Sequence, residues 1–128
     1  SSFLKKDIYS IEVGKGKTKI LIWSQMHGNE STGTKAVFDF FNFLENRKFK
    51  PIQESILKNC TLVFIPMLNP DGSELYTREN SQNIDLNRDV IDKKAGESIL
   101  LQEVLESFNP EFCFNLHDQR TIFSIGTK

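Results

Sequence analysis

The sequence is poor in several residues and patterns on which common protein classes depend. Its two cysteines, Cys60 and Cys113, form neither a disulfide framework nor a Cys-x-x-Cys pair. The 16 basic and 17 acidic residues leave a net charge of −1, so neither nucleic acid nor an anionic membrane surface is favoured as a partner. Repeats and low-complexity segments are absent. What remains is an ordinary globular composition, in which we expect both cysteines to be structural and Cys113 to be a small core residue.

Long hydrophobic runs are also missing. The longest apolar runs have the length of a strand, well short of the about 20 residues that a membrane span needs. The N-terminal residues lack the apolar segment of a signal peptide. Together with the two free thiols, this favours the cytoplasm over an oxidising compartment. The length of 128 residues is enough for one domain and too short for two.

Hydrophobic periodicity divides the chain into strands and helices. Residues 8–13 are predicted to form an edge strand that makes a hairpin with a second strand at 19–24. The helix expected next has Ser31 or Thr32 as its cap. The remaining expected elements are helices at 31–46 and 97–108, buried strands at 61–65 and 111–116, a further strand at 121–125, and a loop or short helix at 49–58.

A polar, irregular stretch lies between the third strand and the second long helix. It opens with a turn signal, Asn69-Pro70-Asp71-Gly72, and continues to about residue 92. Loops of this length inside compact domains are usually functional or disordered. The order of elements predicts an α/β fold with a mixed sheet flanked by helices on both faces. In such sheets ligands gather at the carboxyl ends of the strands.

The two histidines of the chain both stand at such strand ends. His27 opens the tetrapeptide His27-Gly28-Asn29-Glu30 after one apolar run, and His117 follows another. Two imidazoles and one carboxylate are the protein ligands of one class of catalytic zinc site, in which the fourth position takes water or substrate. The sequence therefore suggests that His27, Glu30 and His117 bind Zn²⁺. The competing interpretation is a solvated loop histidine and a glutamate that complements a helix dipole.

The irregular stretch contains a second group of chemically capable residues. Arg88 is suited to clamp a carboxylate, with Asn87 as its hydrogen-bonding partner. Asp85 could accept the other ring N–H of a zinc-bound histidine. Arg78 could polarise a carbonyl and stabilise an oxyanion. Each of these residues could equally belong to a charged surface turn.

Taken together, these motifs resemble the zinc carboxypeptidases, the metallocarboxypeptidases of the M14 type, over roughly residues 20–120. The resemblance implies that His27, Glu30 and His117 are the zinc ligands. It also implies that Arg78 polarises the scissile carbonyl. Asp85 would accept a hydrogen bond from the ring nitrogen of His27 that does not bind the metal. Asn87 and Arg88 would then hold the terminal carboxylate of a peptide or amide substrate. The motifs follow one another in the family's order: His27-Gly28-Asn29-Glu30, Asn69-Pro70-Asp71-Gly72, Arg78 with Asp85-Leu86-Asn87-Arg88, and Leu116-His117-Asp118.

The resemblance stops before the residues that complete such a site. In the family, a general-base glutamate and a tyrosine follow the third zinc ligand, and residues 118–128 contain neither. We therefore expect residues 1–128 to be the N-terminal portion of a zinc carboxypeptidase-like catalytic domain, with a sheet that is incomplete on its C-terminal side. The isolated chain is expected to be inactive as a peptidase and to self-associate through the uncovered sheet edge.

Several functions remain open at this point. The leading one is zinc-dependent hydrolysis of a C-terminal peptide bond. An alternative of the same site class is an amidase or deacylase acting on γ-glutamyl or diamino-acid linkages of cell-wall peptides, or on acyl-amino acids. A third is a non-catalytic module that binds zinc or a peptide carboxylate, and a fourth is a metal-free α/β domain.

Overall fold

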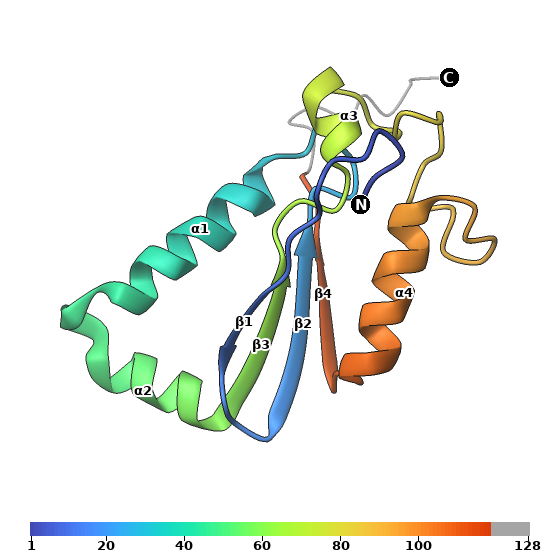
Figure 1. Ribbon diagram of the computed structural model, residues 1–128. Helices are drawn as coiled ribbons and strands as arrows, with labels where there is room; N and C mark the ends of the chain where they lie inside the picture. Colours follow the sequence, from blue (N-terminus) through green and yellow to red (C-terminus); the bar gives the residue numbers. More distant parts are fainter. Residues whose placement is uncertain (119–128) are drawn as a thin grey trace, which may run out of the picture.

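The sheet is built around its most buried strand, β3 (Cys60–Ile65), in which four consecutive residues are buried. In this computed structural model, which describes residues 1–118, the strand order is β1-β3-β2-β4. The central strand β2 (Thr18–Ser24) runs parallel to β3 and to β4 (Phe112–Leu116), whereas β1 (Ile11–Gly14) is antiparallel to β3. Figure 1 shows that the carboxyl ends of the three parallel strands lie at the same end of the sheet.

Helices cover both faces of this sheet. The helices α1 (Thr32–Glu45) and α2 (Lys50–Asn59), joined by the short 3₁₀ helix Arg47–Phe49, lie on one face, and α4 (Gly96–Phe108) lies on the other (Figure 1). Alternate residues of β3 accordingly enter two cores. Leu62 and Phe64 pack with Val37 of α1, and Val63 and Ile65 join the cluster that includes Leu101 of α4. The expected α/β fold with a mixed, flanked sheet is confirmed.

The predicted hairpin between the first two strands is wrong. The strand expected at 8–13 is β1, at Ile11–Gly14, and it pairs with β3 instead of β2. The physical reason is that β3 is apolar on both faces and is therefore stable only between two neighbours. Gly14 permits the turn that follows, since its φ is +86° and a Cβ there would lie 2.2 Å from the carbonyl oxygen of Cys60.

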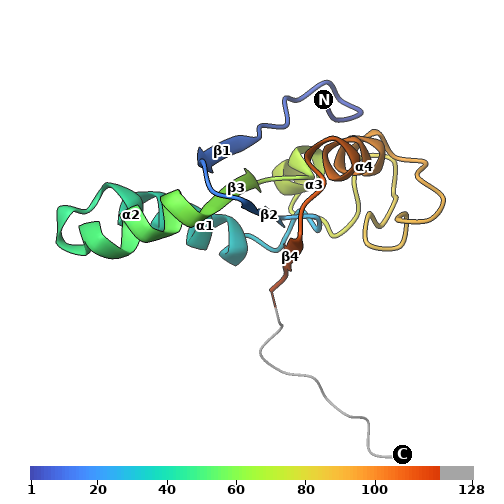
Figure 2. The same ribbon diagram turned by 90° about the horizontal axis from the view of Figure 1, so that it is seen from below.

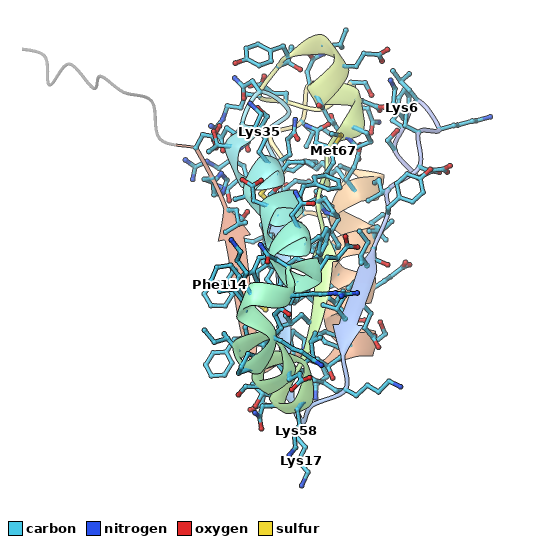
Figure 3. All side chains as sticks on the ribbon, turned by 90° about the vertical axis from the view of Figure 1, so that its left-hand side faces the viewer. Lys6, Lys17, Lys35, Lys58, Met67 and Phe114 are labelled. Carbon is cyan, nitrogen blue, oxygen red and sulfur yellow. The ribbon has the colours of Figure 1, made fainter. Side chains whose placement is uncertain are left out.

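The fourth strand is less buried than its apolar sequence predicts. β4 stands at the edge of the sheet, as the end-on view in Figure 2 shows, and Phe112 and Phe114 are 55% and 52% exposed. Figure 3 shows Phe114 projecting beside the sheet edge. Cys113 is exposed as well, so its expected place in the core is wrong. The strand predicted as buried lacks a neighbour on its outer side among residues 1–118.

The helices largely follow the sequence pattern, with differences at their ends. The segment 49–58, expected as a loop or short helix, is helical: Phe49 ends the 3₁₀ helix and the rest lies in α2. The turn at Asn69 is the start of a short helix, α3 (Pro70–Leu75), in which the Asn69 side chain accepts a hydrogen bond from the Gly72 N–H. α1 is not capped by a side-chain bond from Ser31. Asp118 instead accepts hydrogen bonds from the Thr32 N–H and hydroxyl.

The strand expected at 121–125 lies outside the described residues. Within residues 1–118, every helix is too short or too polar to span a bilayer.

Candidate metal and substrate site

The turn that carries His27 is fixed by a buried glutamine directly after β2. Gln25 adopts a left-handed backbone conformation with φ of 50°, and its side-chain amide donates to the Gly28 carbonyl and to the Ser73 hydroxyl, both at 2.7 Å. Gly28 is required here, because a Cβ would lie 2.0 Å from the backbone of Gly72 in α3. His27 is consequently held at the carboxyl end of the sheet and is only 2% exposed.

Glu30 joins the two histidines. One carboxylate oxygen, Oε1, lies 2.8 Å from His27 Nδ1, and the other, Oε2, lies 2.7 Å from His117 Nδ1. His27, Glu30 and His117 each offer one potential ligand atom, and these three atoms lie within 4.8 Å of one another. The fold thus brings together a strand-end histidine, a residue three positions later and a histidine from the far end of the described chain.

Asp85 lies on the opposite side of the His27 ring. Its Oδ1 is 3.1 Å from His27 Nε2, and its Oδ2 accepts a hydrogen bond from Arg78 Nε at 3.0 Å. Both nitrogens of His27 therefore face carboxylate oxygens. Without a cation, satisfying both contacts would need a proton on each nitrogen, whereas a metal at Nδ1 replaces one proton and leaves Nε2–H to donate to Asp85. The residues present fit a zinc ion bound by His27, Glu30 and His117.

The carboxylates of the cluster are held in their ionised form. Burial of Glu30 acts to raise its pKa, but hydrogen bonds from His117 and His27 outweigh it and hold the pKa of this carboxyl below its usual value. Burial likewise opposes ionisation of Asp85, and the Arg78 guanidinium and His27 hold its pKa below the usual value. An ionised Glu30 is the form that ligates a metal.

Arg78 reaches the cluster from the irregular stretch between α3 and α4. Besides its bond to Asp85, its Nη1 lies 3.7 Å from Glu30 Oε1. The stretch is tied to the His27 turn by a hydrogen bond from the Asn29 N–H to the Thr77 carbonyl at 3.0 Å. Arg78 is partly exposed, so a guanidinium faces solvent beside the potential metal ligands.

Asn87 and Arg88 lie in the turn that begins at Asp85. The Asn87 N–H donates to Asp85 Oδ1 at 3.0 Å, and the Arg88 N–H donates to the Asp85 carbonyl at 2.9 Å. The Arg88 side chain is exposed, and Asn87 is half-buried. The structure therefore gathers five of the seven residues singled out from the sequence and puts the other two in the adjoining turn. That Asn87 and Arg88 bind a substrate carboxylate stays a prediction.

The residues that support this cluster were not identified from the sequence. Gln25 shapes the His27 turn, and two further buried side chains, Asn80 and Asp71, hold the irregular stretch. Nothing in the sequence around Gln25 marks it. Asp71 and Asn80 lie inside polar motifs, but Ser2, which binds Asp71, and Glu97, which binds Asn80, are distant in sequence and only the fold identifies them.

Comparisons with known proteins identify the family of this chain. The family model described as zinc carboxypeptidase matches residues 1–111, and the chain belongs to this family. Carboxypeptidase SOL1 of Arabidopsis thaliana is 38% identical over 69 residues, covering 53% of this chain and 14% of that protein. Carboxypeptidase D of Homo sapiens is 25% identical over 136 residues, covering 88% of this chain and 10% of that protein.

Solved structures show the same fold. A metallo-carboxypeptidase from Pseudomonas aeruginosa, in complex with (2-guanidinoethylmercapto)succinic acid, aligns with a TM-score of 0.85 at 20% identity, covering 93% of this chain and 33% of that one. A murein-tripeptide amidase from Escherichia coli O157 aligns with a TM-score of 0.62 at 16% identity, covering 91% of this chain and 58% of that one. The chain thus spans 10–14% of the length of these curated relatives and about a third of the first structure.

Proposed function

We propose that this chain forms the metal-binding part of a zinc-dependent carboxypeptidase site that hydrolyses the C-terminal peptide bond of its substrate. The observation that carries the proposal is the convergence of His27, Glu30 and His117, with Asp85 behind His27. When bound, zinc would polarise the scissile carbonyl and lower the pKa of its water. Membership of the zinc carboxypeptidase family supports the choice of metal.

The residues of the chain have separate tasks in this proposal. Asp85 keeps the Nδ1 lone pair of His27 directed toward the metal by accepting the Nε2 proton. Arg78 donates to the oxygen that becomes negative as the carbonyl is attacked. Arg88 and Asn87 bind the terminal carboxylate and thereby select the last peptide bond.

The glutamate that serves as general base in the family is not found in residues 118–128. Without that base, a water bound to zinc would not be assisted in its attack, and the leaving amine would receive no proton. We infer that the isolated chain binds zinc and substrate but does not turn substrate over.

The alternative of an amidase for cell-wall peptides is favoured by one observation, the fold shared with the murein-tripeptide amidase. The same zinc ligands and carboxylate clamp would serve both reactions, and the two functions differ in the substrate group beside the scissile bond. A non-catalytic module that binds zinc or a peptide carboxylate is the third possibility. Such a module would bind the peptide without hydrolysing it.

Calorimetric titration of the zinc-loaded chain with matched peptides tests the proposal. A blocked dipeptide with a free C-terminal carboxylate should bind, its C-terminal amide should bind at least about 10-fold more weakly, and Arg88→Ala should abolish that difference. Equal binding of acid and amide would contradict the proposed role of Arg88. Tighter binding of a γ-glutamyl-diaminopimelate dipeptide would favour the amidase, and unchanged binding to the zinc-free chain would favour the non-catalytic module.

Release of the C-terminal residue is measured on the same samples. We expect no release above the buffer rate from the isolated chain. Zinc-dependent release by the wild-type chain, absent in His27→Ala, would show that these residues suffice for catalysis and would contradict the inference about the base.

A further inference from the structure

Arg78 and Asp85 belong to a stretch without regular structure, residues 76–95, yet both must reach His27 and Glu30. A long irregular segment holds side chains at fixed positions only where its backbone is pinned. Asn80 lies between the two residues and is only 3% exposed.

Asn80 holds residues 80–84 together as a compact turn through its hydrogen bonds. Its Oδ1 accepts hydrogen bonds from the Gln82 and Ile84 N–H groups at 2.9 and 3.1 Å, and its own N–H donates to the Ile84 carbonyl at 3.0 Å. Asn83 adopts a left-handed conformation with φ of 58° inside this turn and donates to the Asn80 carbonyl. The direction in which the chain leaves toward Asp85 is therefore set by Asn80.

The remaining polar group of Asn80 is held by a buried carboxylate. Its Nδ2 donates to Glu97 Oε2 at 3.2 Å, and Glu97, in the first turn of α4, is fully buried. The other oxygen of Glu97, Oε1, has no hydrogen-bond partner within residues 1–118. A buried carboxylate with one unsatisfied oxygen costs folding free energy, so stability alone does not account for this side chain.

The residue after Asn80 is held from the other helix. The Ser81 hydroxyl donates to Asp71 Oδ2 at 2.8 Å, and Asp71, in α3, is fully buried. The turn is thus fixed between two buried carboxylates, one from α3 and one from α4.

We propose that Asn80, oriented by Glu97, is a positioning residue for the metal site: it fixes Arg78 and Asp85 at the separation at which Asp85 contacts both Arg78 Nε and His27 Nε2. This inference rests on the proposed zinc site. Among the described residues, no hydrogen bond joins Asn80 to the potential ligands or to Arg78, so its effect on zinc passes through Asp85.

The donor–acceptor pair between Asn80 and Glu97 allows a swap experiment. Asn80→Asp would place two carboxylates against each other, because the side-chain donor is lost while both turn acceptor bonds can persist. Adding Glu97→Gln restores one donor and one acceptor with their positions exchanged. Asn83→Asp is the matched control, since it adds the same charge to an exposed position of the same turn.

The readout is the zinc dissociation constant by chelator competition, with a thermal melt of each zinc-free variant. We expect Asn80→Asp to weaken zinc binding roughly 10-fold or more, and the double variant Asn80→Asp/Glu97→Gln to recover most of that loss. Asn83→Asp should change the constant less than about 2-fold. Wild-type affinity in folded Asn80→Asp, or a folded double variant that fails to recover, would overturn the proposal.

Three further outcomes can be told apart. If Asn80→Asp does not fold, the comparison of Glu97→Gln with the double variant decides: the proposal requires the double variant to bind zinc at least as tightly as Glu97→Gln. If zinc binding is lost in His27→Ala but unaffected in Asn80→Asp, the proposed function stands and only the positioning role fails. If the wild-type chain does not bind zinc at all, the proposed function fails first.

Discussion

At the scale of single residues, the site depends on side chains that bind other side chains as much as on the potential ligands. The Asp85 carboxylate contacts three groups at once: the His27 ring, the Arg78 guanidinium and the backbone of the following turn. Partners of this kind orient a ligand and typically contribute 10–100-fold to metal affinity.

Asp85→Asn tests this contribution. The amide keeps the shape and can still accept from His27, but it loses the charge that pairs with Arg78 and stabilises metal-bound imidazole. We expect zinc to bind about 10-fold more weakly or worse, measured by chelator competition. Asp92→Asn, which removes an exposed carboxylate of the same stretch, should leave the affinity unchanged. Equal affinities of the two variants would exclude a role for Asp85 in zinc binding.

At the scale of elements, the start of α1 illustrates what local sequence does not contain. The sequence predicts the helix and its boundaries closely, but its cap is supplied from the end of β4. Asp118 accepts from the Thr32 N–H at 3.2 Å and from the Thr32 hydroxyl at 2.9 Å. The same segment carries His117, so the cap also links α1 to the metal site.

Asp118→Ala should therefore destabilise the chain by about 1 kcal/mol, the usual cost of losing an N-terminal helix cap. Urea denaturation of the zinc-free chain measures it, and Asp39→Ala, an exposed position in the same helix, is the control. A loss no larger than that of the control would mean that the bonds between Asp118 and Thr32 contribute nothing to stability.

Helices and strands that depend on their own residue pattern could be predicted from the sequence. Strand pairing and burial, which depend on neighbouring elements, could not. The helical repeat of α1 and α4 and the apolar run of β3 identify these elements directly. The pairing of β1 with β3 depends on which strand can be buried on both faces, and the exposure of Phe112 and Phe114 depends on the position of β4 in the sheet. Neither property is contained in a short window of sequence.

The candidate site divides in the same way. Its potential ligands and arginines carry recognisable chemistry at recognisable spacings, and the sequence singles them out. Gln25, Asn80 and Glu97 act through contacts that the fold creates, so no local pattern distinguishes them from ordinary polar residues.

At the scale of the whole molecule, ionised buried carboxylates make stability depend on pH. Burial opposes the charge of Asp71, but hydrogen bonds from Ser2, Leu4 and Ser81 hold the pKa of its carboxyl below the usual value. Because the unfolded state then binds protons first on acidification, the free energy of unfolding falls as pH drops below about 4, the ordinary pKa of an aspartate. Above that range the contribution is fully present.

Asp71→Asn should be less stable than the wild type at pH 7, and the difference should shrink as the pH approaches 3. Urea denaturation of the zinc-free proteins at both pH values checks this. A stability difference that is independent of pH would show that the charge of Asp71 is not what stabilises the fold.

The open edge of the sheet leads to a prediction about assembly. The exposed Phe112 and Phe114 lie beside a strand edge without a partner in residues 1–118, and such edges promote association. We expect the isolated chain to dimerise at about 100 μM, and Phe114→Lys to be monomeric because the charge blocks edge pairing. Light scattering distinguishes the two. Phe38→Lys, which removes an exposed aromatic residue of α1, should still dimerise, and a monomeric wild-type chain would contradict the prediction.

We expect the fold of residues 1–118 to form a zinc site without any further part of a protein. Calorimetric titration of Zn²⁺ into the chelator-stripped chain, beside His117→Ala, tests it most directly. We expect one tight site in the wild type and a strongly weakened one in the variant, because the ligand that follows β4 is lost. A well-folded wild-type chain that binds no zinc, or a variant that binds it equally well, would show that these residues do not form the site.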